Sequence, residues 1–336
     1  MNFLVTGGSG YLGSSIIKYI KNKKHNVLNL DTNSNNQFDT IKVDVLNYEK
    51  LKSIFNNNKI DIVIHNIAKV PITKNKKDFY EINVLGTKNI LELSKQFKIK
   101  KFIFISSSAV YGIPNNLPIT EKSKKIPIEP YGISKKIAED ECIKNFKDLN
   151  ICIIRPRTII GRKRFGIFSV LFDWISKDLK VPVLNNGENL YQFIDLEDLT
   201  EAIYKSAFTG NSDDFNIGAD EFYSIRGLLQ TLIDNNKSKS KIVDISNSSI
   251  LKLGNIFQKL NFIPLQDYHF KAYGQSIYFD CEKAKSKLNW VPKQNNLQSL
   301  QDSYNYFLKT NEDQPNESVH QKKIRTILLR YGTLFI

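Results

Sequence analysis

The chain opens with a strand, a glycine-rich turn and a helix in direct succession, and this combination restricts its fold more than any other feature. Asn2 to Thr6 is predicted to be a short buried strand, Gly7 to Gly13 (GGSGYLG) the turn, and the amphipathic segment that ends near Asn22 a helix. Glycine allows the backbone to turn tightly and approach a pyrophosphate, which the N–H groups and dipole of the helix N-terminus then bind. In this context the glycine pattern predicts a dinucleotide-binding unit.

The second predicted strand, Asn26 to Leu30, indicates which dinucleotide is bound. It ends in Asp31, where a carboxylate can accept hydrogen bonds from the ribose hydroxyls of adenosine. Asp31 would repel a 2′-phosphate, and Thr32-Asn33-Ser34 supplies no arginine or lysine to neutralise one. NAD is therefore expected as the cofactor rather than NADP.

Strands and helices continue to alternate, which predicts an α/β fold built on a doubly wound parallel sheet. Such sheets bind ligands at the carboxyl ends of their strands. Asp44 and Val45 follow the third strand and are expected near the adenine, whereas Ile67 and Ala68 follow the fourth strand and are expected beside the central part of the cofactor. The further predicted elements are strand Ile41 to Val43, helix Tyr48 to Phe55, strand Ile60 to His65, helix Asp78 to Phe97, strand Lys101 to Ile105 and strand Ile151 to Arg155.

A helix that starts after Pro130 would place Tyr131 and Lys135 one turn apart, so that the ammonium group lies beside the phenol. An isolated tyrosine titrates near pH ~10, and a nearby cation favours the phenolate, which suits an acid or base near neutral pH. The same spacing also occurs where a packed ring lies beside a solvated charge. Lys135 is expected in solvent unless a site captures it, because the predicted core-facing stripe consists of Ile133, Ile137, Ala138 and Ile143.

Composition argues against several other classes of function. The formal charge of +14 comes from lysines spread along all 336 residues, so no nucleic-acid partner is expected. The three cysteines form no Cys-x-x-Cys pair and the four histidines lack ligand spacing, so no metal site is predicted. An apolar run of membrane-span length and a signal peptide are both missing, which together with reduced thiols predicts a cytoplasmic location.

Several motifs together resemble the extended short-chain dehydrogenase/reductase family, specifically its NAD-dependent epimerase/dehydratase branch. The resemblance covers about residues 1 to 310 and implies a Rossmann domain over residues 1–165, to which later segments return. A smaller C-terminal substrate-binding region is expected over residues 166–310. Besides Asp31, the motifs that carry the resemblance are Thr6 to Gly13, Asn83-Val84-Leu85-Gly86-Thr87, Ser106 to Gly112 (SSSAVYG), Pro130 to Lys135 (PYGISK) and Phe215-Asn216-Ile217-Gly218.

The resemblance also implies roles for particular residues. Tyr131 is the acid/base, Lys135 assists it and holds the nicotinamide ribose, and Ser107 steadies the reacting oxygen. Hydride transfer between a sugar carbon and NAD then accompanies proton transfer at Tyr131, with a nucleotide sugar as the expected substrate. The cofactor-binding residues are expected to be Gly7, Gly10, Tyr11, Leu12, Asp31, Asp44, Val45, Ile67, Ala68, Asn83, Tyr131, Lys135 and Pro156.

The quaternary structure is also an expectation from the resemblance. Many relatives form homodimers through two helices, which correspond to Asp78 to Phe97 and Tyr131 to Phe146 in this chain. A homodimer is therefore expected.

Departures from the family pattern narrow the range of activities that are expected of this chain. Dehydratases carry an acidic pair after the catalytic threonine, but this chain has Ser108 and Ala109 there, which favours an epimerase or an oxidoreductase. Tyr191 stands where many relatives have a diphosphate-binding arginine, and the segment Arg155 to Thr158 lacks the asparagine common in sugar-nucleotide epimerases. A compensating guanidinium, or else a solvated surface loop, is expected at Arg157, Arg162 or Arg164.

Two alternatives to a nucleotide-sugar enzyme therefore stay open. One is an NAD-dependent dehydrogenase of a non-nucleotide, sterol-like alcohol, which the missing arginine allows. The other is a non-catalytic, dinucleotide-binding regulatory protein. The joint presence of Ser107, Tyr131 and Lys135 argues against the second, because a binding module needs no proton relay.

Residues 311–336 are predicted to form a linker and a basic amphipathic tail. The segment Thr310 to Ser318 is polar, and a helix beyond it would gather apolar side chains on one face, with basic ones mostly elsewhere. Such a helix can lie on an anionic membrane surface, or dock on the body of the protein or on a second subunit. The tail is expected to aid association with a membrane or a partner. Its apolar face consists of Ile324, Ile327, Leu328, Tyr331, Leu334 and Phe335.

Overall fold

The computed structural model describes residues 1–34, 37–70, 77–162, 165, 168–245 and 274–313. The chain divides into two compact units, and it returns to the first unit twice after leaving it. The first unit comprises Met1–Thr158, Leu196–Gly218 and Phe279–Lys293, and the second comprises Ile159–Asp195, Ala219–Tyr278 and Gln294–Ile336.

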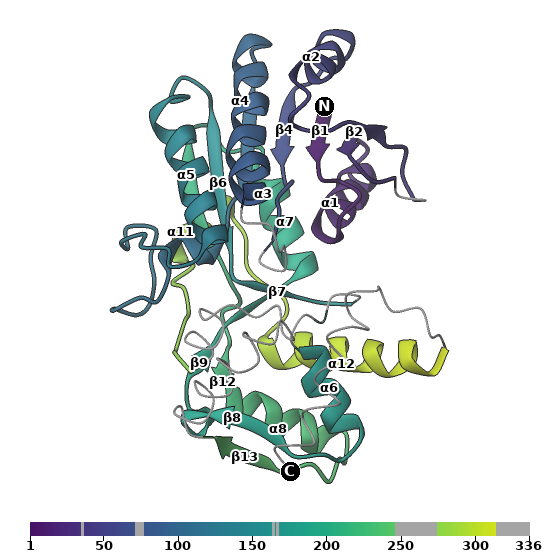
Figure 1. Cartoon of the computed structure of the whole chain (residues 1–336), viewed down its shortest axis with the longest axis vertical. Helices are drawn as coiled ribbons and strands as arrows, with labels where there is room; N and C mark the ends of the chain where they lie inside the picture. The colour runs from purple at the N-terminus through teal and green to yellow at the C-terminus, as the bar shows by residue number, and fades with distance from the viewer. Residues whose placement is uncertain (35–36, 71–76, 163–164, 166–167, 246–273, 314–336) are drawn as a thin grey trace. The chain divides into compact units, whose positions relative to one another are not determined.

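The first unit contains a seven-stranded sheet in the order β11-β6-β5-β4-β1-β2-β3 (Figure 1). Every neighbouring pair is parallel, and the strand order reverses between β1 and β4, which confirms the predicted doubly wound sheet. Its elements are β1 (Asn2–Thr6), α1 (Tyr11–Asn22), β2 (Asn26–Asp31), β3 (Ile41–Lys42), α2 (Tyr48–Asn57), β4 (Ile62–His65), α3 (Lys77–Tyr80), the π-helix η1 (Glu81–Gly86), α4 (Thr87–Gln96), β5 (Lys101–Ile105), the short 3-10 helix η2 (Ser108–Tyr111), α5 (Pro130–Lys144), β6 (Ile151–Pro156), α7 (Leu196–Ser206), β11 (Asp213–Ile217) and α11 (Glu282–Leu288).

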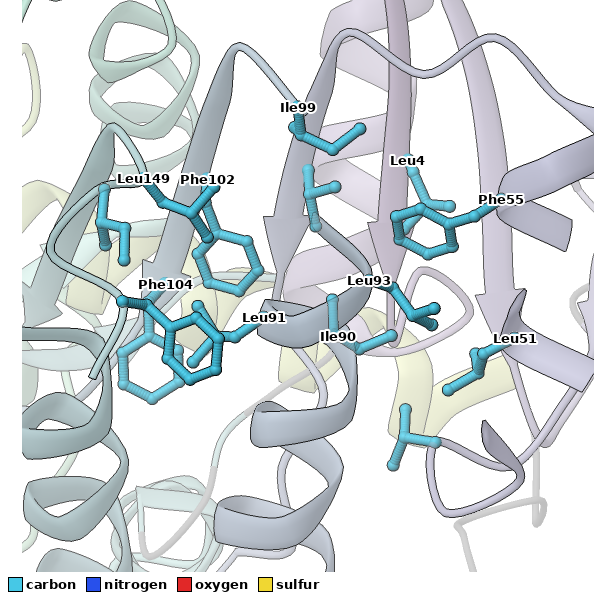
Figure 2. Packing of buried hydrophobic residues seen from close by; sticks show 14 of the residues in the cluster. Leu4, Leu51, Phe55, Ile90, Leu91, Leu93, Ile99, Phe102, Phe104 and Leu149 are labelled. Atoms are coloured by element: carbon cyan, nitrogen blue, oxygen red, sulfur yellow. The ribbon is translucent and has the colours of Figure 1, made fainter. Parts of the chain in front are cut away.

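Alternate side chains of each strand point to opposite faces of the sheet, so both faces carry apolar side chains. Helices cover both faces and bury these side chains. Leu4 of β1 belongs to a core that includes Phe55 of α2 and Leu93 of α4, as Figure 2 shows. The ring of the next residue toward the N-terminus, Phe3, stacks on Tyr204 of α7 with centroids 6.4 Å apart, on the other face. A fully buried apolar side chain of this size contributes about 1.5–3 kcal/mol to folding.

The helix predicted from Asp78 to Phe97 is wrong as a single α-helix. The structure divides it into α3, the π-helix η1 and α4. At Gly86, the last residue of η1, an added Cβ would lie 2.5 Å from Cγ2 of Val45, so the backbone approaches a neighbouring segment closely there. Helical periodicity does not reveal a π-turn, which inserts extra residues into one turn and is frequent at functional sites.

The core-facing stripe predicted for α5 is also wrong in part. Ile133 is 44% exposed and Ile143 is 54% exposed, whereas Ala138 is buried as predicted. The face that α5 buries carries Lys135 and Glu139 instead. Burial of these charged groups is tolerated because each has polar partners, which the apolar periodicity of the sequence does not show.

The second unit consists of short paired strands and of helices. Its elements are β7 (Thr158–Ile160), α6 (Phe168–Ser176), β8 (Val181–Leu184), the 3-10 helix η3 (Asn185–Gly187), β9 (Leu190–Tyr191), β10 (Phe193–Asp195), β12 (Tyr223–Ser224), α8 (Ile225–Asn235), β13 (Ile242–Ile245) and α12 (Asn296–Asp313). Its strands pair as β10-β7, β12-β9 and β13-β8. Its core combines aliphatic side chains with aromatic ones, among which the ring of Phe168 contacts Phe193 edge-on with centroids 5.0 Å apart.

Of the predicted C-terminal linker and tail, the structure describes only the first residues. Helix α12 extends to Asp313, so the segment predicted as a linker from Thr310 begins within a helix. The predicted amphipathic tail from Ile324 to Phe335 lies outside the described residues. Within the described part of the chain, none of the helices has the length and apolar character needed to span a bilayer.

Candidate functional site

The glycine turn between β1 and α1 is as tight as predicted. Gly7 has φ +68°, and an added Cβ would lie 3.0 Å from the backbone of Ile67. At Gly13 an added Cβ would lie 2.1 Å from the carbonyl oxygen of Gly7. The amide of Gly10 donates to that same carbonyl at 3.2 Å, and Gly10 is the N-cap of α1. These contacts leave no room for side chains, so the backbone itself forms the surface that a pyrophosphate can approach.

Asp31 lies at the end of β2, beside the glycine turn. Its carboxylate accepts a hydrogen bond from the amide of Ser9 at 3.0 Å and another from the amide of Asn33 at 3.0 Å. Asn29, two residues earlier, donates to the hydroxyl of Ser9 at 3.2 Å. The carboxylate is therefore held against the turn, where the sequence predicts contact with a ribose.

Most of the other predicted cofactor contacts follow strands of the same sheet, with different surroundings. Asp44 is exposed, and its carboxylate accepts from the amide of Leu46 at 2.9 Å. Val45 is buried against Gly86. The remaining candidates are Tyr11 and Leu12 in the first turn of α1, Ile67 and Ala68 after β4, and Pro156 at the end of β6.

Helix α5 brings Tyr131 and Lys135 to the carboxyl end of β5. The carboxylate of Glu129 caps the helix, accepting from the amides of Tyr131 at 2.8 Å and Gly132 at 2.5 Å, and burial raises the pKa of Glu129. Lys135 is buried, and its ammonium donates to the carbonyl oxygen of Ile105 at 2.7 Å. Lys135 was expected in solvent unless a site captured it. The end of β5 does capture its ammonium group, so the lysine is not solvated.

Burial changes the chemistry of this lysine. Desolvation lowers the pKa of Lys135 to about 7, while the carboxylate of Glu139 opposes the shift. The ammonium also lies 4.7 Å from the centroid of the Phe104 ring. A cation close to its own neutral form, one helical turn from a phenol, suits a site that passes protons near neutral pH.

Ser107 is the third predicted catalytic residue, and it follows the same strand. It is two residues beyond the carbonyl that binds Lys135, and its hydroxyl accepts from the amide of Ala109 at 3.2 Å as it caps η2. The structure thus gathers Ser107 and Lys135 at one strand end, with Tyr131 a turn away on α5. A hydroxyl, a phenol and an ammonium are the groups needed to move a proton to or from a substrate alcohol.

A buried ion network under the site was missed at the sequence level. Arg155 of β6 donates to both carboxylate oxygens of Glu139, at 2.8 and 2.9 Å, and to Asp214 at 2.7 Å. Glu139 also accepts from the hydroxyl of Ser106 at 2.5 Å. The position of Glu139, four residues after Lys135 on one helix face, is the only sequence signal for it.

Asn83 in the π-helix η1 connects separate segments around the site. Its side-chain oxygen accepts from the amide of Lys69 at 2.7 Å, and its nitrogen donates to the hydroxyl of Ser134 at 2.9 Å. Ser134 in turn donates to the carbonyl oxygen of Tyr131 at 2.7 Å. The motif that contains Asn83 was recognised, but these partners are distant in sequence and were not predicted.

The positions that depart from the family pattern also have defined surroundings. Arg157 is buried, donates to the hydroxyl of Ser108 at 3.0 Å and lies over the ring of Phe279 at 5.7 Å, so it is not part of a solvated loop. Arg162 is exposed, and Arg164 lies outside the described residues. In the second unit, the ring of Tyr191 packs beside Phe193 at 5.1 Å.

A metal site is not indicated in the part of the chain that the structure describes, where no group of three histidine, cysteine, aspartate or glutamate side chains could hold an ion. The three cysteines are free and buried. Desolvation raises the pKa of Cys152 to about 12, so this thiol is not poised to react.

Comparison with known proteins identifies the family of this chain. A statistical description of the NAD dependent epimerase/dehydratase family matches residues 3–218. The uncharacterised protein y4nG of Sinorhizobium fredii is 36% identical over 310 residues, which cover 90% of this chain and 78% of that protein. A putative UDP-glucose 4-epimerase of Methanocaldococcus jannaschii is 30% identical over 248 residues, which cover 68% of this chain and 80% of that protein.

Solved structures share the fold. A UDP-glucose 4-epimerase from Thermotoga maritima, crystallised with UDP-glucose, matches with a TM-score of 0.76 at 23% identity, covering 93% of this chain and 100% of that one. The Bordetella bronchiseptica enzyme WbmG, in complex with NAD, matches with a TM-score of 0.76 at 19% identity, covering 92% and 94%. With its glycine turn, its Tyr131 and Lys135 helix and a family match over residues 3–218, the chain belongs to the NAD-dependent epimerase/dehydratase family.

Proposed function

We propose that this chain is an NAD-dependent epimerase of nucleotide sugars. The observation that carries the proposal is the hydrogen bond from the Lys135 ammonium group to the carbonyl of Ile105. Lys135 is one helical turn from Tyr131, and Ile105 is two residues before Ser107. Burying an ammonium group costs free energy that its polar partners only partly offset, and a strongly perturbed lysine beside a tyrosine is typical of an acid/base site. The substrate class is supported by the similarity to a putative UDP-glucose 4-epimerase.

The residues of the first unit fit NAD. The glycine turn has no space for side chains at Gly7 and Gly13, which suits a pyrophosphate at the N-terminus of α1. Asp31 would hold the adenosine ribose, and Lys135 the nicotinamide ribose. When bound, NAD supplies the nicotinamide ring that takes up a hydride and returns it.

The proton of the reacting hydroxyl is handled by the chain's own residues. Tyr131 takes the proton from the substrate alcohol as the alcohol is oxidised. It gives the proton back when the keto sugar, having rotated to present its other face, is reduced. Lys135 stabilises the phenolate by its charge, and Ser107 hydrogen-bonds the reacting oxygen. Acid/base groups placed in this way typically contribute about 10²–10⁴-fold to a rate.

Epimerisation is proposed rather than dehydration because of the residues after Ser107. Elimination of water needs a further acid and base, and the positions where dehydratases carry an acidic pair hold Ser108 and Ala109. The hydroxyl of Ser108 accepts from the guanidinium of Arg157. The pair formed by Ser108 and Arg157 is suited to hydrogen bonding rather than to abstraction of a carbon-bound proton.

The proposal predicts a specific loss of turnover in Tyr131→Phe. The purified protein is first tested for co-purified dinucleotide and then assayed with a panel of UDP- and dTDP-sugars, both for epimer formation and for net NADH production. The wild type is expected to form an epimer without net NADH. Tyr131→Phe is expected to lose about 10²-fold or more in turnover while its affinity for NAD changes little, because the ring is kept and only the hydroxyl is removed.

Other results would contradict the proposal. Net NADH from a sugar would indicate a dehydrogenase, and turnover of a sterol-like alcohol but of no nucleotide sugar would favour that alternative. Full activity in Tyr131→Phe would exclude Tyr131 as the acid/base. NAD binding without turnover of any substrate would leave a regulatory protein.

We also propose that the chain forms a homodimer through α5 and the neighbouring α3 and η1. Helix α5 exposes Ile133 and Ile143, 44% and 54% exposed, on the side away from the sheet. Tyr80 of α3 and Leu85 of η1 are 51% and 39% exposed. Apolar side chains on helices that pack together form the kind of surface that a second copy covers.

A further inference from the structure

His65 lies at the centre of a buried hydrogen-bond chain that no part of the proposed mechanism uses. It is the last residue of β4 and is fully buried. Its Nδ1 lies 2.9 Å from the hydroxyl of Thr6, at the end of β1, and its Nε2 lies 3.0 Å from the hydroxyl of Thr87, at the start of α4. One imidazole ring thus joins the strand before the glycine turn to the helix after the π-turn.

The direction of each hydrogen bond follows from counting hydroxyl protons. Thr87 has one hydroxyl proton, which it donates to the carbonyl oxygen of Asn83 at 2.7 Å, so it can only accept from His65. Nε2 of His65 must therefore carry the ring proton, which leaves Nδ1 as an acceptor for the hydroxyl of Thr6. That hydroxyl oxygen accepts in turn from the amides of Asn66 at 3.2 Å and Ile67 at 3.4 Å. Each bond supports the direction of the next.

The surroundings of His65 favour its neutral form. The ring lies between Thr6, Thr87 and the rings of Phe102 and Phe104, and among the described residues the ammonium of Lys135 is a cation that acts on it. Burial, helped by Lys135, lowers the pKa of His65 to about 3. A second positive charge here would also oppose the charge on Lys135, so neutrality of His65 preserves the chemistry of the neighbouring site.

The series of hydrogen bonds continues from Thr87 to helix α5, which carries Tyr131. Thr87 holds the backbone carbonyl of Asn83, whose side chain donates to the hydroxyl of Ser134. Ser134 donates to the carbonyl of Tyr131. The end of β1, which leads into the glycine turn, is thereby linked to the first turn of α5 through side chains and the backbone carbonyl of Asn83, entirely within the first unit.

We propose that His65, as its Nε2–H tautomer, is a positioning residue that sets the placement of Tyr131 relative to the glycine turn through Thr87, Asn83 and Ser134. The inference rests on the proposed function only where turnover is measured. The dinucleotide is held by the turn and the acid/base by α5, so the distance between them decides the reaction geometry. Displacements of about 1 Å in such a geometry cost on the order of 10²-fold in rate.

The test compares isosteric variants at two buried threonines. Thr87→Val removes the acceptor for His65, whereas Thr87→Ser keeps the hydroxyl. Thr200→Val is the matched control, because Thr200 is buried on α7 and likewise donates to the carbonyl four residues earlier, at 2.7 Å. Among the described residues, the other hydrogen-bond partner of its hydroxyl is that of Ser15, at 3.0 Å, rather than a histidine. Turnover and KM, NAD affinity by calorimetry, Tm, the ¹⁵N signals of His65 and the ¹³Cζ signal of Tyr131 are measured for each.

In the wild type we expect a protonated Nε2, an unprotonated Nδ1 and no titration of His65 between about pH 5 and 8. Thr87→Val should move the Tyr131 signal and lower kcat about tenfold or more with little change in KM, and Thr87→Ser should restore both. Thr200→Val should lower Tm to a similar extent but leave kcat and the Tyr131 signal unchanged.

Three results would overturn the inference: an Nδ1–H tautomer, a His65 that titrates near its ordinary pKa, or a Tyr131 signal that is the same in Thr87→Val as in the wild type. The NMR measurements need neither substrate nor NAD. A protein that turns over no sugar but shows the expected tautomer and the expected Tyr131 response would contradict the proposed function and support the positioning role.

Discussion

Single atoms decide whether the glycine turn can exist. At Gly13, helix propensity alone would favour alanine by about 1 kcal/mol. An added Cβ, however, would lie 2.1 Å from the carbonyl oxygen of Gly7 and 2.6 Å from Cα of Gly8, and backbone atoms cannot move aside as a flexible side chain can. Close packing therefore outweighs propensity at this residue.

Gly13→Ala is accordingly expected to destabilise the protein by about 1–3 kcal/mol, the usual cost of overpacking, and to weaken NAD binding about tenfold or more. Gly210→Ala is the control, because nothing lies within 4 Å of a Cβ built there, and it should stay within about 0.5 kcal/mol of the wild type. Urea unfolding and calorimetric titration with NAD measure the two effects. Equal behaviour of the two variants would show that the turn relaxes.

At the scale of one element, α5 serves two purposes that its sequence does not separate. Its inner face carries Lys135, for the site, and Glu139, for the ion network with Arg155. Its outer face carries Ile133 and Ile143, which the apolar pattern alone would place inside. Because polar groups can be buried when they are paired, the pairing rather than the hydropathy decides which face turns inward.

Glu139→Ala is expected to cost about 3–5 kcal/mol, because it leaves the guanidinium of Arg155 buried with one carboxylate partner fewer. The next residue offers the control. Asp140 pairs with Lys136 at 2.7 Å, but its side chain is 37% exposed, so Asp140→Ala should cost no more than about 1 kcal/mol. Denaturant unfolding of both variants decides this, and similar losses would mean that the network is not effectively buried.

For the molecule as a whole, the proposed dimer predicts a mass of twice 38.7 kDa in solution. Ile143→Glu should raise the dissociation constant of the dimer about tenfold or more, since a charge would be buried at an apolar contact. Val291→Glu is the control, because Val291 is 61% exposed and lies away from α5 and η1 in sequence, before α12. Sedimentation velocity over a range of concentrations measures both. A monomer at all concentrations, or equal effects of the two variants, would exclude this interface.

Much of the first unit could be predicted from the sequence because its signals are local. The strand over Asn2–Thr6, the tight turn and the helix to Asn22 follow from short apolar runs and glycines. Tyr131 and Lys135 were recognised by spacing within a family motif. The second unit is less predictable, since its strands are short and pair across long stretches of chain, as β13 does with β8.

The amino-acid sequence by itself determined the alternation of strands and helices, the dinucleotide turn and the family to which the chain belongs, because these depend on residues that are near neighbours. Only the tertiary structure decided that Lys135 is bound by Ile105, that η1 is a π-helix and that His65 joins Thr6 to Thr87. The physical reason is that a buried polar group is stable only with its partners. Those partners come from strands and helices that are brought together by folding.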